Sequence, residues 1–132
     1  MEKILAAMMI DENSALAGIH ALNLAKRINA HLSFLLIEHP SGEDEDEIVR
    51  MNEKIISLLQ NGRSENLNVD MFCSRGDYAD ELIKFALEEK VTMVIIAPPS
   101  IIKCSKIVFD EFIEKLHHRL NCRMDIVHKR ED

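Results

Sequence analysis

The sequence predicts an α/β fold, a three-layer α/β/α sandwich with an open, five-stranded parallel sheet at its centre. Five short apolar runs alternate along the chain with four longer stretches whose apolar residues recur at helical spacing. This alternation implies right-handed crossovers between parallel strands. The length of 132 residues, without a linker or an internal repeat, indicates a single domain at 1–132.

The expected strands differ in how completely they are buried. The first run is almost continuously apolar, as in a strand that helices cover on both faces. The third alternates, with Val69, Met71 and Cys73 on one side, and the fourth stops at Pro98-Pro99. The predicted strands are 3–10, 31–37, 68–73, 91–97 and 122–128.

The expected helices begin at recognisable capping residues. Asp11–Ser14 precedes the first helix, and the acidic run Glu43–Glu47 opens the second. We interpret that run as a solvated first turn, favoured by the helix dipole, rather than as a cation site. Asn61-Gly62 predicts the end of the second helix. The predicted helices are 15–28, 43–60, one that starts at 76–77, and 109–120.

Composition excludes several classes of partner. The net charge is −7, whereas a nucleic-acid backbone or an anionic membrane needs a basic surface. No run reaches the roughly 20 apolar residues of a membrane span, so we expect no membrane insertion. Three cysteines, far apart and odd in number, form no disulfide framework and no paired metal motif. We therefore expect a reducing cytoplasm and no metal site.

Ligands of open parallel sheets bind outside the carboxyl ends of the strands, where the strand order reverses. The loops expected there are 11–14, 38–42 and 98–105. They contain no Gly-rich phosphate cradle and no Walker lysine motif, and no nucleophile elbow is present. These absences predict that the chain is not an enzyme. Cys104, beside Lys103 and Lys106, is interpreted as an incidental thiol, with a redox role as the alternative.

Four segments together resemble the universal stress protein family. The first strand ends in Asp11 and Ser14 opens the next helix, and residues 21–30 resemble the family's first helix. Residues 75–83, Arg-Gly-Asp-Tyr-Ala-Asp-Glu-Leu-Ile, resemble its Gly-x-x-x-x-Glu-Ile segment, and residues 88–96 resemble the approach to strand four. The resemblance covers almost the whole chain. It implies a Rossmann-like sheet with strand order 3-2-1-4-5.

The resemblance also implies a nucleotide site without its phosphate half. Family members that bind ATP carry Gly-x2-Gly-x9-Gly-Ser/Thr after strand four. Laid on this chain without gaps, the motif falls on Ala97, Ser100, Asp110 and Glu111, so all three glycines are missing. The remaining family contacts, to ribose and adenine, are matched by Asp11 and by the backbone of Ile37. The other interpretation of Asp11, which we favour, is a helix cap or an acid that ends the strand.

The residues that stand in and near the positions of the motif glycines predict that this loop repels phosphate. Pro98 and Pro99 each remove an N–H donor. Asp110 and Glu111 are expected at the N-terminus of the fourth helix, where a carboxylate fills the anion site. A phosphate ~4 Å away would meet about 4 kcal/mol of repulsion per charge pair at an effective dielectric of about 20. Lys103 and Lys106 could offset this repulsion or bind the acids directly.

The last strand is the expected dimer contact, because the family commonly dimerises through it. Here Arg123 and Asp125 interrupt its apolar pattern. One interpretation is that these charges protect a sheet edge. The other, which we favour, is a two-fold antiparallel pairing centred on Met124, with Arg123 opposite Asp125 of the second copy. The expected interface is Arg123, Met124, Asp125, Ile126 and Val127.

The function expected from these features is a non-catalytic stress or signalling module. It acts through protein contacts, as a homodimer and with an unidentified partner, and it needs no cofactor. The alternative is an adenine nucleotide sensor that holds AMP, cyclic AMP or adenosine through Asp11 and Ile37. A slow ATPase is the third hypothesis.

Overall fold

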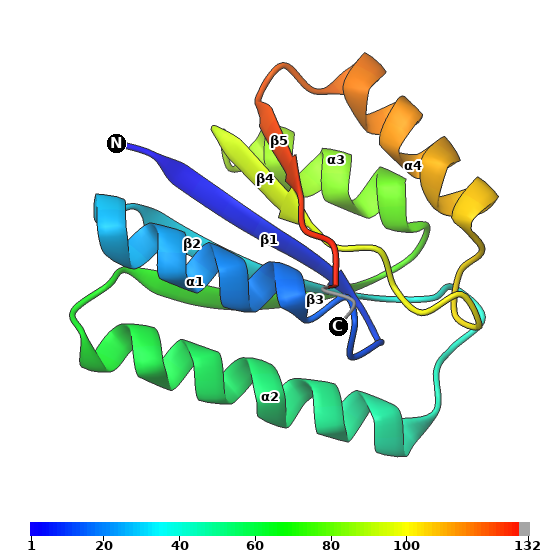
Figure 1. Ribbon diagram of the computed structural model, residues 1–132, viewed down its shortest axis with the longest axis horizontal. Helices are drawn as coiled ribbons and strands as arrows, with labels where there is room; N and C mark the ends of the chain where they lie inside the picture. Colours follow the sequence, from blue (N-terminus) through cyan, green and yellow to red (C-terminus); the bar gives the residue numbers. More distant parts are fainter. Residues whose placement is uncertain (130–132) are drawn as a thin grey trace.

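The computed structural model describes residues 1–129 and contains a five-stranded parallel sheet (Figure 1). The strand order is β3-β2-β1-β4-β5, as predicted. The strands are β1 (Lys3–Met9), β2 (His31–Glu38), β3 (Val69–Arg75), β4 (Met93–Ile96) and β5 (Arg123–Ile126). The predicted fold class is confirmed, although β4 and β5 are shorter than expected.

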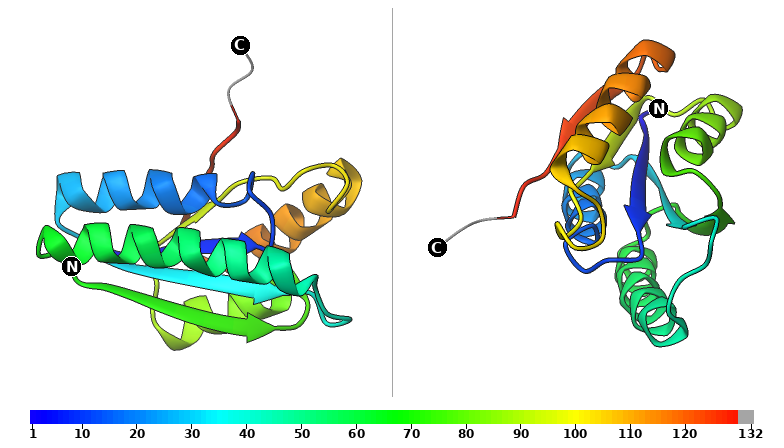
Figure 2. Two further views of the ribbon diagram at one scale, coloured as in Figure 1. Left: turned by 90° about the horizontal axis from the view of Figure 1, so that it is seen from below. Right: turned by 90° about the vertical axis from the view of Figure 1, so that its right-hand side faces the viewer.

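Two pairs of helices cover the two faces of the sheet (Figure 2). The helices are α1 (Leu16–Ile28), α2 (Glu45–Ser64), α3 (Tyr78–Glu88) and α4 (Lys106–Arg119). Ile4, Ala6 and Met8 of β1 pack in the core on the α1–α2 side, and Leu5 and Ala7 pack on the α3–α4 side. Burial of both faces explains why β1 is continuously apolar. Within residues 1–129, no helix combines the length and the apolarity that crossing a membrane requires.

Gly62 does not end α2, which continues to Ser64, so the predicted helix stop is wrong. Gly62 is buried inside the helix. A Cβ atom there would lie 2.8 Å from Val69 Cγ2 and 3.1 Å from Leu22 Cδ1. The glycine therefore allows α2 to approach β3 and α1 closely. The turn comes later, where Asn66 adopts a left-handed φ of 64°.

Helix α4 begins at Lys106, three residues earlier than predicted. Ser105 is its N-cap, and the Ser105 hydroxyl accepts a hydrogen bond of 3.3 Å from the Val108 amide. Asp110 and Glu111 therefore lie in the second turn, where both are exposed to solvent. The prediction that they occupy the N-terminus of this helix is wrong. The cap was missed because the residues that follow it are exposed and do not continue the apolar periodicity.

Both charged residues of the edge strand β5 have partners within the chain. Arg123 donates to the Glu2 carboxylate, and Asp125 lies 3.1 Å from Nε2 of His20 on α1. The expected pairing of Arg123 with Asp125 of a second copy therefore competes with two contacts inside one molecule.

The backbone of β5 leaves the Met124 amide available for pairing at the edge of the sheet. The Arg123 and Val127 amides donate to the carbonyls of Thr92 and Ile96. Successive amides along a strand point in opposite directions, and the Met124 amide therefore faces the open edge.

Gly62→Val is expected to lower the free energy of unfolding by about 2–3 kcal/mol, because the branched side chain has no space against Val69 and Leu22. Urea denaturation followed by circular dichroism measures the loss. Ser57→Val is the matched control, since Ser57 lies exposed on the same helix. We expect the control to change stability by no more than about 0.5 kcal/mol. Equal effects of the two variants would contradict the close-approach role of Gly62.

Candidate functional site

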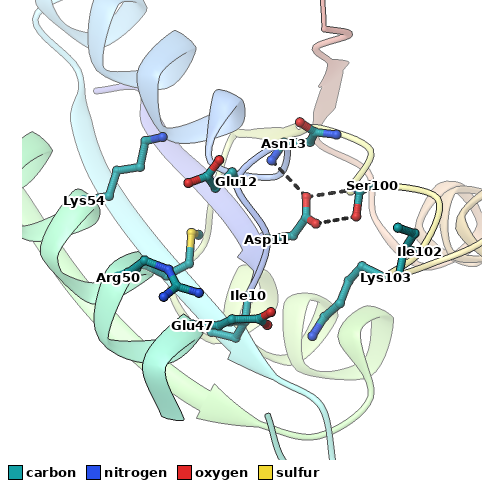
Figure 3. Close-up of a pocket in the computed structure, with 11 residues that line it drawn as sticks. Ile10, Asp11, Glu12, Asn13, Glu47, Arg50, Lys54, Ser100, Ile102 and Lys103 are labelled. Atoms are coloured by element: carbon teal, nitrogen blue, oxygen red, sulfur yellow. Dashed lines mark hydrogen bonds between the residues drawn. The ribbon is translucent and has the colours of Figure 1, made fainter. Parts of the chain in front are cut away.

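A cleft lies at the carboxyl ends of β1 and β4, where the strand order reverses (Figure 3). Parallel α/β sheets bind their ligands at this position. The larger cavity, of about 540 Å³, is bounded by the loop after β1, the loop after β4 and helix α2. A smaller cavity of about 270 Å³ lies beside the loop after β2 and the start of α4. Lys103 lines both cavities.

Asp11 fastens the loop after β1 to the loop after β4. One carboxylate oxygen accepts from the amides of Asn13, Ser14 and Ser100, at 2.9, 3.3 and 3.0 Å. The other accepts from the Ser100 hydroxyl at 2.7 Å. Asp11 thus caps the turn before α1, which is the structural role that the sequence left open. Among the described residues, the oxygen that accepts from the Ser100 hydroxyl has no other donor, so a ribose hydroxyl that bound Asp11 would donate to this oxygen, beside Ser100 or in its place.

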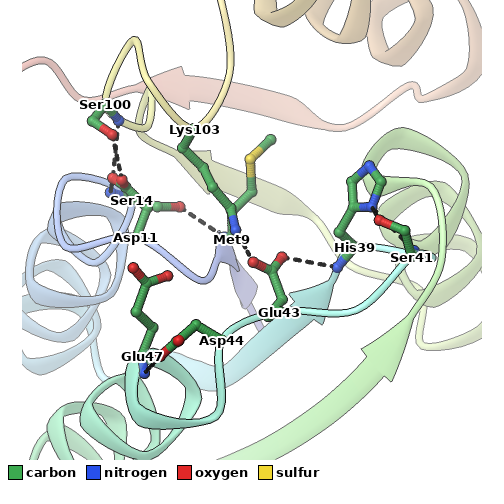
Figure 4. Close-up of polar contacts among 10 residues, drawn as sticks. All are labelled: Met9, Asp11, Ser14, His39, Ser41, Glu43, Asp44, Glu47, Ser100 and Lys103. Carbon is green, nitrogen blue, oxygen red and sulfur yellow. Dashed lines mark hydrogen bonds and ion pairs between the residues drawn. The ribbon is translucent and has the colours of Figure 1, made fainter.

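An ion pair between Glu43 and Lys103 crosses the mouth of the cleft (Figure 4). It joins the loop after β2 to the loop after β4, and the exposed fractions of the two side chains are only 4% and 22%. The second Glu43 oxygen accepts a 3.0 Å hydrogen bond from the His39 amide. Burial lowers the pKa of Lys103, and the negative charge of Asp11 opposes that effect. The prediction that all of Glu43–Glu47 forms a solvated turn is therefore wrong for Glu43.

The rest of the acidic run forms the first turn of α2. Asp44 is the N-cap, and its carboxylate accepts a 3.1 Å hydrogen bond from the Glu47 amide. Glu45, Asp46 and Glu47 follow in the first turn and are exposed, as predicted. In the part of the chain that the structure describes, no three His, Cys, Asp or Glu residues cluster in a way that could hold a metal ion.

Several solved structures with this architecture are named as universal stress proteins. The universal stress protein UspA from Lactobacillus plantarum superimposes with a TM-score of 0.73 at 14% identity, over 96% of this chain and 97% of that one. A universal stress protein in complex with cAMP gives 0.65 at 17% identity, over 96% of each chain. A universal stress protein from Archaeoglobus fulgidus in complex with dAMP gives 0.61 at 15% identity, over 96% of each chain.

This chain has the universal stress protein fold. The resemblance inferred from sequence motifs is confirmed at the level of the fold. No protein-family model matches the sequence, and no curated protein matches it. Identities of 14–17% explain why the three-dimensional comparison detects a likeness that the two sequence comparisons do not.

The positions matched to the universal stress protein motif do not form one cradle. Ser100 contacts Asp11 at the cleft. The side chains of Ile37 and Ala97 are buried in the core, on opposite faces of the sheet. Asp110 lines a separate groove beside β5. Of the predicted nucleotide contacts, the structure therefore brings together only Asp11 and Ser100, with Ile37 at the floor of the smaller cavity.

The smaller cavity is lined by two groups whose pKa is raised by burial, Tyr78 and Cys104. The Tyr78 hydroxyl donates a 2.8 Å hydrogen bond to the Ala7 carbonyl, and burial raises the pKa of Tyr78. Burial also raises the pKa of the Cys104 thiol, opposite to the effect expected from Lys103 and Lys106. A reactive thiolate is therefore not favoured at Cys104.

Two residues of the larger cavity were missed in the sequence. Arg50 and Lys54 line it from α2. Their spacing of four residues places them on one face of that helix, and this spacing is the signal that could have drawn attention to them.

Glu43→Gln is expected to lower the free energy of unfolding by about 2 kcal/mol, because it leaves the largely buried ammonium of Lys103 without a counter-charge. The double variant Glu43→Gln/Lys103→Met is expected to lose less, since neither charge remains and the introduced amide oxygen still accepts from the His39 amide. Urea denaturation compares the two. Glu45→Gln, on the exposed first turn, is the matched control. If Glu43→Gln proves as harmless as this control, the ion pair contributes nothing to stability.

Proposed function

We propose that this chain is a non-catalytic module of the universal stress protein type that acts through protein contacts and has lost the ATP phosphate site. The observation that carries the proposal is the ion pair between Glu43 and Lys103 at the mouth of the sheet. The structural neighbours named as universal stress proteins support the assignment to this type.

The physical reason that we propose for the loss of ATP binding differs from the one that the sequence predicted. Glu43, rather than Asp110 or Glu111, supplies the carboxylate at the mouth of the cleft. Lys103, a cation in the same loop as two of the three missing glycines, is already paired with it. Pro98 and Pro99 supply no amide donors to that loop, and Ser105 caps the Val108 amide. An entering triphosphate would therefore meet a negative charge and few free donors.

Exposed apolar side chains around the same loop support a role in protein contacts. Ile101, Ile102 and Ile107 have exposed fractions of 77%, 96% and 74%, and Val108 is 41% exposed. Clustered apolar side chains at a surface are typical of protein interaction sites. In this chain the loop that would hold phosphate presents the kind of surface that another protein covers.

A homodimer through β5 is part of the proposal. Met124 directs its amide to the open edge, so a two-fold antiparallel contact centred on it would exchange a pair of backbone hydrogen bonds. Arg123 and Asp125 already have partners in their own chain. The dimer would therefore depend on backbone pairing and on the apolar residues Ile126 and Val127.

A second candidate function is the binding of AMP, cyclic AMP or adenosine. The cavity of about 540 Å³ beside Asp11 favours it, since small-molecule sites are commonly of this size. Three structural neighbours are named as complexes with cAMP, dAMP and AMP.

Isothermal titration calorimetry with Mg-ATP, AMP and adenosine tests the leading proposal. We expect no binding of Mg-ATP and no turnover, because Glu43 occupies the mouth. AMP or adenosine binding without ATP binding would favour the second candidate. The Glu43→Gln/Lys103→Met variant is the matched comparison, and a gain of ATP binding in it would identify the ion pair as the obstacle. ATP binding or hydrolysis by the unmodified chain would refute the proposal.

Sedimentation equilibrium tests the dimer. We expect the unmodified chain to dimerise, and Met124→Pro to be monomeric, because proline removes the outward amide and leaves the hydrogen bonds to β4. Circular dichroism verifies that the variant is folded. Arg123→Ala/Asp125→Ala is the control and should remain dimeric. A monomer at the highest accessible protein concentration would remove the dimer from the proposal.

A further inference from the structure

The larger cavity has two cationic side chains on one wall (Figure 3). Arg50 and Lys54 lie one turn apart on α2, so their side chains are neighbours on the same helix face. Within residues 1–129, neither forms an ion pair. Five other lysines and arginines do: Lys26, Arg63, Lys103, Lys115 and Arg123.

Within residues 1–129, the carboxylates that line the same cavity form no ion pair with Arg50 or Lys54. Asp11 is occupied by four hydrogen bonds from Asn13, Ser14 and Ser100. Glu12 and Glu47 also line the cavity and are exposed, as Arg50 and Lys54 are, so water and salt screen all four charges. In the described part of the chain, neither acid is paired with Arg50 or Lys54. The chain has 23 acidic and 16 basic residues, so the missing pairing does not reflect a shortage of acids.

Part of the cavity lining is apolar. The side chains of Ile10 and Met51 are buried, with exposed fractions of 2% and 3%, and both line the cavity. Ile102, from the loop after β4, adds an exposed apolar side chain at the edge. The cavity therefore offers two cations on α2 beside an apolar surface, which suits a ligand with an anionic end and a flat uncharged body.

We propose that Arg50 and Lys54 bind the phosphate group of a small phosphate monoester whose uncharged part lies against Ile10 and Met51. A guanidinium binds two phosphate oxygens at once, and the neighbouring ammonium supplies a second charge. This phosphate position lies on α2 and is separate from the N-terminus of α4. The inference rests on the second candidate function in one respect. That function identifies the uncharged part of the phosphate monoester as adenosine.

Titrations of the full-length, ¹⁵N-labelled chain with AMP, adenosine and inorganic phosphate test the inference. Amide shifts locate each probe, and calorimetry measures its affinity. The test variant is Arg50→Gln/Lys54→Gln, which keeps strong helix formers on the exposed face of α2. The matched control is Lys84→Gln/Arg119→Gln, which removes one lysine and one arginine from α3 and α4. Lys54→Arg retains the charge and is expected to retain AMP binding.

We expect AMP to shift the amides of Asn13, Arg50 and Met51, and to bind the test variant at least about tenfold more weakly than the control. Adenosine, which lacks the phosphate, should bind both equally. If AMP binds both double variants equally, the inference is wrong and the second candidate function stands. If neither AMP nor phosphate shifts amides at this cavity in the unmodified chain, the inference is also overturned.

Discussion

Strand β1 is buried on both faces, and the position of every loop around the cleft depends on this. Its residues Ile4 to Met8 are at most 1% exposed, because helices pack on each side of the central strand. Sequestering this much apolar surface is the main driving force for such a core. Asp11 is the first acidic residue after this buried segment. It therefore lies at the carboxyl edge of the sheet, between the loops that follow β2 and β4.

The polar residues at this edge mainly hold the loops together. Asp11 is bound to Ser100, and Glu43 is bound to Lys103, so both contacts end on the loop after β4. A loop that clamps phosphate needs free amides and a conformation that glycine permits. Here two prolines and two side-chain contacts fix the loop instead. The two cations that we propose as anion ligands, Arg50 and Lys54, lie on α2, so the proposal places the anion at the side of that helix and not at the N-terminus of α4.

The fold was predictable from the sequence, whereas the site was predictable only in part. Periodicity identified the strands and helices, and the family resemblance added the strand order. The errors concern contacts between distant residues. Glu43 appeared to be one acid of a solvated run, because its partner Lys103 lies 60 residues further along the chain. Gly62 resembled a helix stop, yet its role depends on Val69 across the interface between α2 and β3. Ser105 is a local cap, but the exposed residues after it conceal the start of α4.

Tyr78 has a consequence for spectroscopy. The chain has no tryptophan, and Tyr78 is its single tyrosine, buried where α3 meets β1 with its hydroxyl bound to the Ala7 carbonyl. Intrinsic tyrosine emission therefore originates from one site, which lines the smaller cavity but not the larger. The protein carries a built-in fluorophore that distinguishes occupancy of one half of the cleft from occupancy of the other.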